Sequence, residues 1–130
     1  MQQRQHPRFS VHLPLVIGTS GPGTARHAVR TKDISLGGAC LHADSDFPVG
    51  TALTLYVPWL GPDGQPTAHT EAVTGRVVWM TRIEQEYQLG VVFDAHPAAA
   101  SRRCLEELCG TLERSTPGLA PLPKQTFDLS

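Results

Sequence analysis

The chain has 130 residues, of which 40% are apolar, and its formal net charge is −1. This length predicts a single domain with a modest hydrophobic core. The near-neutral charge excludes a global basic field able to hold a nucleic-acid polymer, so we expect no DNA or RNA partner.

The first third of the chain predicts three strands. Residues 9–17 carry apolar side chains at every second position, which is typical of a strand with one buried face. Pro14 falls on the other face and indicates an edge or a bulge. Glycines and a proline over residues 18–23 predict a turn. A more polar strand follows over residues 26–34, and a short one over residues 39–41.

Three more strands are expected between residues 53 and 93. Residues 53–57 alternate, and the glycine- and proline-rich residues 61–66 predict a hairpin loop after them. Residues 71–80 form the next strand, and residues 89–93 the last, after a polar turn over residues 82–88. In the strand over residues 71–80 we expect one face to carry Val73, Val77 and Trp79 and the other to carry Thr74, Arg76 and Val78.

The period of the pattern then changes to that of a helix. Over residues 97–114 the apolar positions Leu105, Leu108, Cys109 and Leu112 share one face, and Pro97 suits a first helical turn. Residues 115–130 lack periodicity and predict a flexible tail. Closure of the strands would remove exposed sheet edges, so we expect a mainly β fold: a six-stranded antiparallel barrel with one C-terminal amphipathic α-helix.

Two short motifs carry the functional signal. Arg4 and Arg8 form R-x3-R, and Asp33, Ser35 and Gly38 form D-x-S-x2-G. Arginine can grip phosphate oxygens or the O6 and N7 atoms of guanine with a planar pair of donors. A carboxylate accepts hydrogen bonds from guanine, a serine hydroxyl both donates and accepts, and a glycine permits a sharp turn or a close approach. The set suits a small anionic nucleotide.

Together the two motifs resemble the signature of the PilZ domain, the bacterial receptor module for cyclic di-GMP. Gly75–Trp79 and Gly90–Phe93 also resemble the G-x-V-x-W and G-V-x-F strand pair of that family, so the resemblance extends to about residue 114. It implies a domain over residues 1–114, with residues 1–8 as a loop that folds over the ligand, residues 97–114 as the helix, and residues 115–130 as the tail.

The resemblance implies that the ligand-binding residues are Arg4, Arg8, Asp33, Ser35 and Gly38. Gly37 and Trp79 are second candidates, because the indole of Trp79 could stack beside a guanine. Arg76, Arg82 and Lys32 are weaker ones. Each has a plainer interpretation: the arginines as solvated charges, Asp33 and Ser35 as turn residues, and Trp79 as part of the core.

We therefore expect a receptor or adaptor that binds cyclic di-GMP and passes the signal to an unidentified partner protein in motility, biofilm or exopolysaccharide control. The alternative is an adaptor of the same fold that acts without the nucleotide. No constellation of side chains indicates an enzyme, a cofactor or a metal site. Cys40, Cys104 and Cys109 predict reduced, buried thiols. The chain lacks a signal-peptide pattern and a membrane-spanning run, which predicts a cytoplasmic protein, either a monomer or a homodimer.

Overall fold

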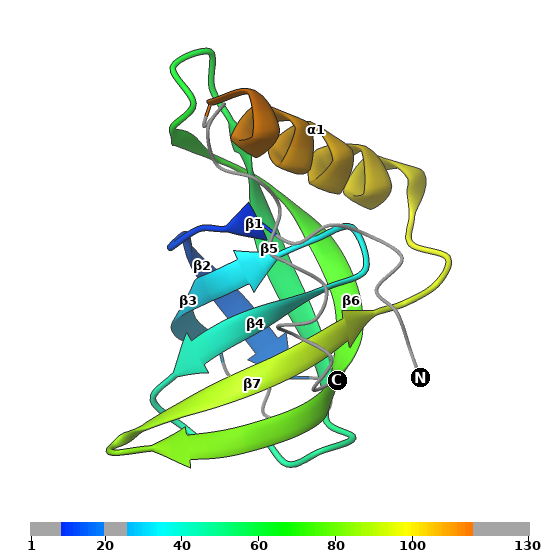
Figure 1. Cartoon of the computed structure of the whole chain (residues 1–130). Helices are drawn as coiled ribbons and strands as arrows, with labels where there is room; N and C mark the ends of the chain where they lie inside the picture. The colour runs from blue at the N-terminus through cyan, green and yellow to red at the C-terminus, as the bar shows by residue number, and fades with distance from the viewer. Residues whose placement is uncertain (1–8, 20–25, 116–130) are drawn as a thin grey trace, which may run out of the picture.

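The computed structural model describes residues 9–19 and 26–115, whose strands form one antiparallel sheet that closes on itself (Figure 1). The sheet order is β1-β3-β2-β5-β6-β7-β4, and β4 also pairs with β3, so β2 to β7 complete a barrel-like ring. This confirms the mainly β, antiparallel architecture. The elements are β1 (Phe9–Ser10), β2 (Pro14–Thr19), β3 (Arg26–Ile34), β4 (Gly38–Ala43), β5 (Ala52–Leu60), β6 (Pro66–Ile83), β7 (Glu86–Phe93) and α1 (Ala99–Ser115).

The strand predicted over residues 9–17 is divided into β1 and β2, which pair with the same strand, β3. Ser10 pairs with Asp33 and Pro14 with Arg30, so three residues on one side face two on the other. The Thr31 hydroxyl bridges the interruption by donating to the Val11 carbonyl and accepting from the Leu13 amide at 2.8 Å. The extra residue interrupts the ladder there, and the Thr31 hydroxyl satisfies backbone groups that a regular strand partner would otherwise pair.

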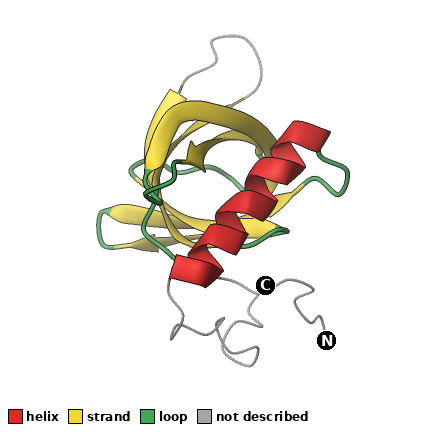
Figure 2. Ribbon diagram, turned by 90° about the horizontal axis from the view of Figure 1, so that it is seen from above, coloured by secondary structure: helices red, strands yellow, loops and turns green. Residues whose placement is uncertain are grey.

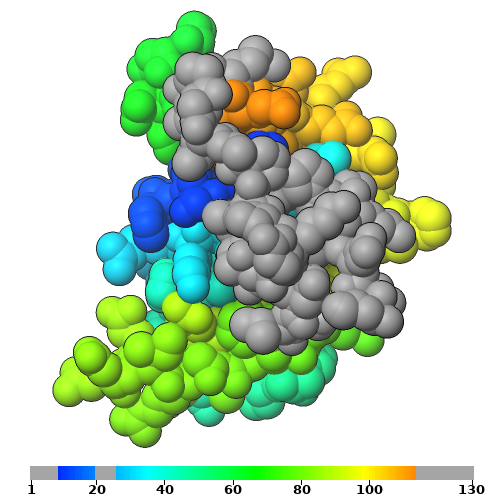
Figure 3. Space-filling view, viewed as in Figure 1, coloured from blue at the N-terminus to red at the C-terminus, as the bar shows by residue number. Residues whose placement is uncertain are grey.

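The predicted turn over residues 82–88 is wrong, because only Glu84 and Gln85 lie between β6 and β7. Glu84 has a φ of 59°, the left-handed conformation that two-residue hairpin turns require. The end of this hairpin, yellow-green in Figure 3, projects from the rest of the molecule. Polar side chains are therefore compatible with strand structure here, since both faces of the projecting ribbon meet water.

Helix α1 lies across one opening of the ring (Figure 2) and contacts β5, β6 and β1. It begins at Ala99 rather than at the predicted Pro97; the Ala98 carbonyl accepts the hydrogen bond of the first turn, from the Arg102 amide at 2.9 Å. The predicted apolar stripe is confirmed: Leu105, Leu108 and Cys109 are buried and Leu112 is partly buried. Cys104, which was not predicted to belong to the stripe, is buried with them. The Ser101 hydroxyl donates to the Ala72 carbonyl and so fixes the helix on β6.

We expect Leu108→Ala to lower the free energy of unfolding by about 2–5 kcal/mol, because the side chain is 2% exposed and its loss leaves a cavity between helix and ring. Urea unfolding followed by circular dichroism measures the change. Glu107→Ala, at an exposed position one residue earlier, is the matched control and should change stability by less than about 0.5 kcal/mol. Equal effects of the two substitutions would contradict the packing of α1 described here.

The thiols of α1 should be poorly reactive in the folded protein. Burial raises the pKa of Cys104 to about 11, with a smaller contribution from Glu71, and raises the pKa of Cys109 to about 11, with a smaller contribution from Glu113. Since the thiolate is the reactive form, a Cys40→Ser variant should react slowly with a disulfide-exchange reagent near pH 8 and completely after denaturation. Rapid reaction of both thiols without denaturant would show that α1 leaves the ring readily.

Candidate functional site

A β-bulge in β3 turns Asp33 toward the outer surface of the ring. Val29 and Thr31 point inward and are buried, so strict alternation would also point residue 33 inward. The register shifts between Thr31 and Asp33, which leaves Lys32 as the extra residue and pairs Asp33 with Cys40. Cys40 lies between the core residues Ala39 and Leu41 and therefore faces outward, and its partner Asp33 faces the same way.

A second bulge, in β6, does the same for Trp79. Val73 and Val77 point into the core, but the register shifts between Val77 and Trp79, so that Trp79 pairs with Gly90. Gly90 separates the core residues Leu89 and Val91 and faces outward. The prediction that Trp79 shares a face with Val73 and Val77 is therefore wrong: the extra residue, Val78, reverses the alternation.

The two bulges place Asp33 and Trp79 in one row across the outer surface. Asp33 pairs with Cys40, Cys40 with Gly90, and Gly90 with Trp79, which takes the row across β3, β4, β7 and β6. We call these four residues the outer row. Neighbouring strands lie about 4.8 Å apart, so the row is about 14 Å wide, a width suited to a dinucleotide.

Trp79 lies flat against the backbone of Gly90. A Cβ atom at residue 90 would be 2.1 Å from the indole Nε1, so only glycine leaves room for the ring. The indole is partly buried and partly open to the surface. It could therefore stack on a planar ligand from the end of the row opposite Asp33, whose side chain is 5% exposed.

Ser35 holds the turn between β3 and β4. Its hydroxyl accepts from the amides of Gly37 at 3.1 Å and Gly38 at 3.2 Å and lies 3.3 Å from the Gly38 carbonyl, to which it donates. These three bonds use the full capacity of a hydroxyl. Ser35 is also 4% exposed, so its evident role is to shape the turn beside Asp33. A contact with ligand stays a prediction.

The two glycines of the motif have different surroundings. A Cβ at Gly38 would lie 2.3 Å from the Val91 carbonyl oxygen, so the close approach of β4 to β7 requires glycine. Gly37 is partly exposed, and its carbonyl accepts from the Phe93 amide at 2.9 Å. Gly38 is therefore required for closing the ring, while Gly37 presents backbone at the surface beside the outer row.

The remaining candidates are distributed unevenly. Arg4 and Arg8 lie outside the described residues. Arg76 is exposed and pairs with Val92, which pairs with Gly38, so it belongs to the outer surface beside the row. Lys32 is the exposed bulge residue next to Asp33. Arg82 is not brought to this region: it lies near the end of the projecting hairpin and donates from Nε to the Glu84 carbonyl at 3.0 Å.

Cys40 and Gly90 are the members of the outer row that the sequence did not single out for binding. Both lie between core residues of a regular strand, so the alternation of β4 and β7 could have placed them on the outer face. Within residues 9–19 and 26–115, no group of three or more His, Cys, Asp or Glu side chains could hold a metal ion. In the same part of the chain, no helix is long and apolar enough to span a membrane.

Solved structures with the same fold come from several bacteria. The inhibitor of motility MotI/DgrA of Bacillus subtilis matches with a TM-score of 0.60 and 18% identity, over 91% of this chain and 54% of that one. The K. pneumonia MrkH–c-di-GMP complex matches with a TM-score of 0.65 and 19% identity, over 90% and 55%. The PilZ domain of YcgR from Escherichia coli, solved with c-di-GMP, matches with a TM-score of 0.61 and 18% identity, over 88% and 95%.

The chain thus spans about half the length of MotI and MrkH and nearly the whole of the isolated YcgR domain. At these identities the likeness shows the fold. No match was found among curated proteins. The family model described as the PilZ domain matches residues 2–110. This match covers most of the sequence and includes both motifs, and the chain therefore belongs to the PilZ domain family.

Proposed function

We propose that this protein is a cytoplasmic receptor for cyclic di-GMP that passes the level of the second messenger to a partner protein. The observation that carries the proposal is the outer row, which holds Asp33 and Trp79 about 14 Å apart on one surface, next to the turn of the D-x-S-x2-G motif. A carboxylate and an aromatic ring at that separation can each engage a different part of one dinucleotide.

Each end of the row contributes a different interaction. The carboxylate of Asp33 can accept from the N1–H and N2–H groups of a guanine, and the partly exposed backbone of Gly37 leaves room for the base. The indole of Trp79 can stack on a ring face, which contributes about 1–3 kcal/mol per base. Ser35 and Gly38 act through the turn, because they fix its shape and its distance from β7.

Arg4 and Arg8 supply the positive charge that the row lacks. Phe9, the residue after Arg8, pairs with Ile34, so the chain enters the ring directly beside the motif. Two guanidinium groups there can neutralise the two phosphodiester charges or bind guanine O6 and N7. A hydrogen bond to a charged group contributes about 1.5–3 kcal/mol, and a micromolar dissociation constant corresponds to a binding free energy of about 8 kcal/mol. The two arginines and the outer row together can supply most of that free energy.

The signal then depends on a difference between two states. A ligand shifts a conformational equilibrium only by its differential affinity for the two conformations. Arginines that contact the ligand from outside the ring would change the surface next to the outer row when the ligand binds, and the partner protein would recognise the changed surface. No chemical step on the nucleotide is part of this mechanism.

Calorimetric titration tests the proposal. We expect cyclic di-GMP to bind with micromolar or tighter affinity, and Arg8→Ala to weaken binding at least about tenfold, because a charged hydrogen bond is lost. Arg103→Ala removes the same charge from an exposed position on α1 and should bind normally. A folded protein that gives no heat with the ligand would refute the receptor function and favour an adaptor that works without the nucleotide.

Tryptophan fluorescence tests the role of Trp79 separately. The chain has two tryptophans, and Trp59 lies elsewhere, with its Nε1 donating to Glu71 at 3.0 Å. A Trp59→Phe variant should therefore keep the change in emission caused by cyclic di-GMP, whereas Trp79→Phe should lose it. Trp79→Ala should also weaken binding by about 1–3 kcal/mol. Ligand-dependent emission that survives in Trp79→Phe would remove Trp79 from the site.

A further inference from the structure

A second polar row lies beside the outer row on the same surface. Arg30 pairs with His42, His42 with Gln88, and Gln88 with Thr81. His42 follows Cys40 by two positions and Gln88 precedes Gly90 by two, so the second row faces outward and lies about 7 Å from the first. We call Arg30, His42 and Gln88 the second row. The second row was not apparent from the sequence, because Arg30, His42 and Gln88 lie on three different strands.

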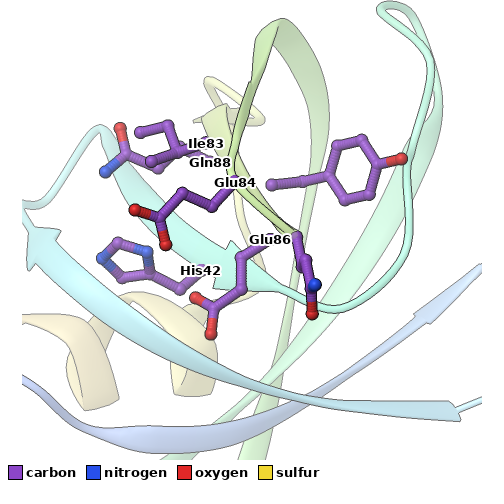
Figure 4. A pocket seen from close by; sticks show the side chains of 7 residues that line it. His42, Ile83, Glu84, Glu86 and Gln88 are labelled. Atoms are coloured by element: carbon purple, nitrogen blue, oxygen red, sulfur yellow. The ribbon is translucent and has the colours of Figure 1, made fainter.

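His42 separates two hollows in this part of the surface. One, of about 380 Å³, lies against the β6–β7 hairpin and is lined by His42, Gln88, Ile83, Glu84 and Glu86, among others (Figure 4). The other, of about 260 Å³, is lined by Arg30, His42, Asp44 and Glu86 together with the apolar Pro14 and Ala28. The second row therefore has a hollow on each side of His42. His42 and Gln88 each lie two positions along their strand from a member of the outer row.

The charges around these hollows select the kind of group they can accept. Figure 4 shows the carboxylates of Glu84 and Glu86 gathered on the same side of the hairpin as the His42 ring. Glu86 lines both hollows, Glu84 lines the first, and Asp44 lines the second together with Arg30. The two hollows therefore hold three carboxylates and one guanidinium. A phosphate would be repelled, whereas a guanine suits both signs: its O6 and N7 accept from arginine, and its N1–H and N2–H donate to a carboxylate or to the Gln88 amide oxygen.

We propose that the second row binds the hydrogen-bonding edge of the second guanine of cyclic di-GMP. This inference rests on the proposed function, which assigns the first guanine to Asp33 and a separate stacking contact to Trp79. The sugar–phosphate ring separates the two bases of one molecule, and the hollow of about 260 Å³ that Arg30 and Glu86 line is large enough for one base. Arg30 then reads O6 and N7, and Glu86, which lines the same hollow, reads the donor groups of the base. Gln88 reaches the edge of the base from the other side of His42.

A pair of cyclic dinucleotides isolates this contact. Cyclic GMP–AMP keeps one guanine for Asp33 and presents an adenine, which lacks O6 and the N2 amino group, to the second row. The unsubstituted protein should bind it about tenfold more weakly than cyclic di-GMP, the loss of about 1.4 kcal/mol that a missing bidentate contact causes. Arg30→Ala should lower the affinity for cyclic di-GMP by about the same factor and the affinity for cyclic GMP–AMP by much less. The variant should therefore no longer prefer cyclic di-GMP over cyclic GMP–AMP.

The control is Arg103→Ala, which removes one positive charge from α1 and should keep both the affinity and the preference. Gln88→Ala removes no charge and should also reduce the preference for cyclic di-GMP over cyclic GMP–AMP. Thermal melting of each variant checks that the ring is intact. Normal binding of cyclic di-GMP with an unchanged preference in both Arg30→Ala and Gln88→Ala would overturn the second-row proposal and leave the receptor function standing. Absence of binding by the unsubstituted protein would instead refute the receptor function, and this inference with it.

Discussion

Two β-bulges determine which side chains the outer surface of this ring presents. In a closed antiparallel ring the inward positions must be apolar or, like Thr31, hydrogen-bonded, and a regular strand alternates strictly, so the outward positions are fixed once the core is filled. One extra residue reverses that alternation for the rest of the strand. Lys32 and Val78 are those extra residues, and beyond them Asp33 and Trp79 face outward while Ile34 and Met80 still pack on the core.

The bulge in β6 works only because β7 has glycine where the indole of Trp79 comes closest. Trp79 turns outward directly over Gly90, and any Cβ there would occupy the position of the indole ring. Gly38 similarly allows β4 to approach the Val91 carbonyl. The two glycines therefore couple ring closure to the shape of the outer row: a larger residue at either position would displace backbone or indole before it touched a ligand.

How far the sequence could predict this arrangement differs from element to element. The stripe of Leu105 and Leu108 predicted α1, because burial of one helical face repeats regularly along the chain. The face of Trp79 was predicted incorrectly, because three apolar residues in succession, from Val77 to Trp79, are compatible with either alternation. Only the pairing with β7 decides between them, and that pairing is set by residues far along the chain. The motif residues were identified by resemblance, but the hydrogen bonds of Ser35 became evident only from the turn itself.

The same turn limits how a bound ligand can influence the rest of the molecule. The Gly37 carbonyl accepts from the Phe93 amide, so the motif is joined directly to the last residue of β7. Beyond Phe93, the Asp94 amide donates to the Thr74 carbonyl at 2.9 Å, and a hollow of about 280 Å³ lined by Leu36, Pro97 and Arg102, among others, separates the turn from the start of α1. A close-packed core has low compressibility and transmits strain, so a displacement of the turn passes first to the elements that lie directly beside it. Movement of the turn would therefore reach the end of β7 and the first turn of α1 before any other element, because these are its hydrogen-bonded neighbour and the surface across the hollow.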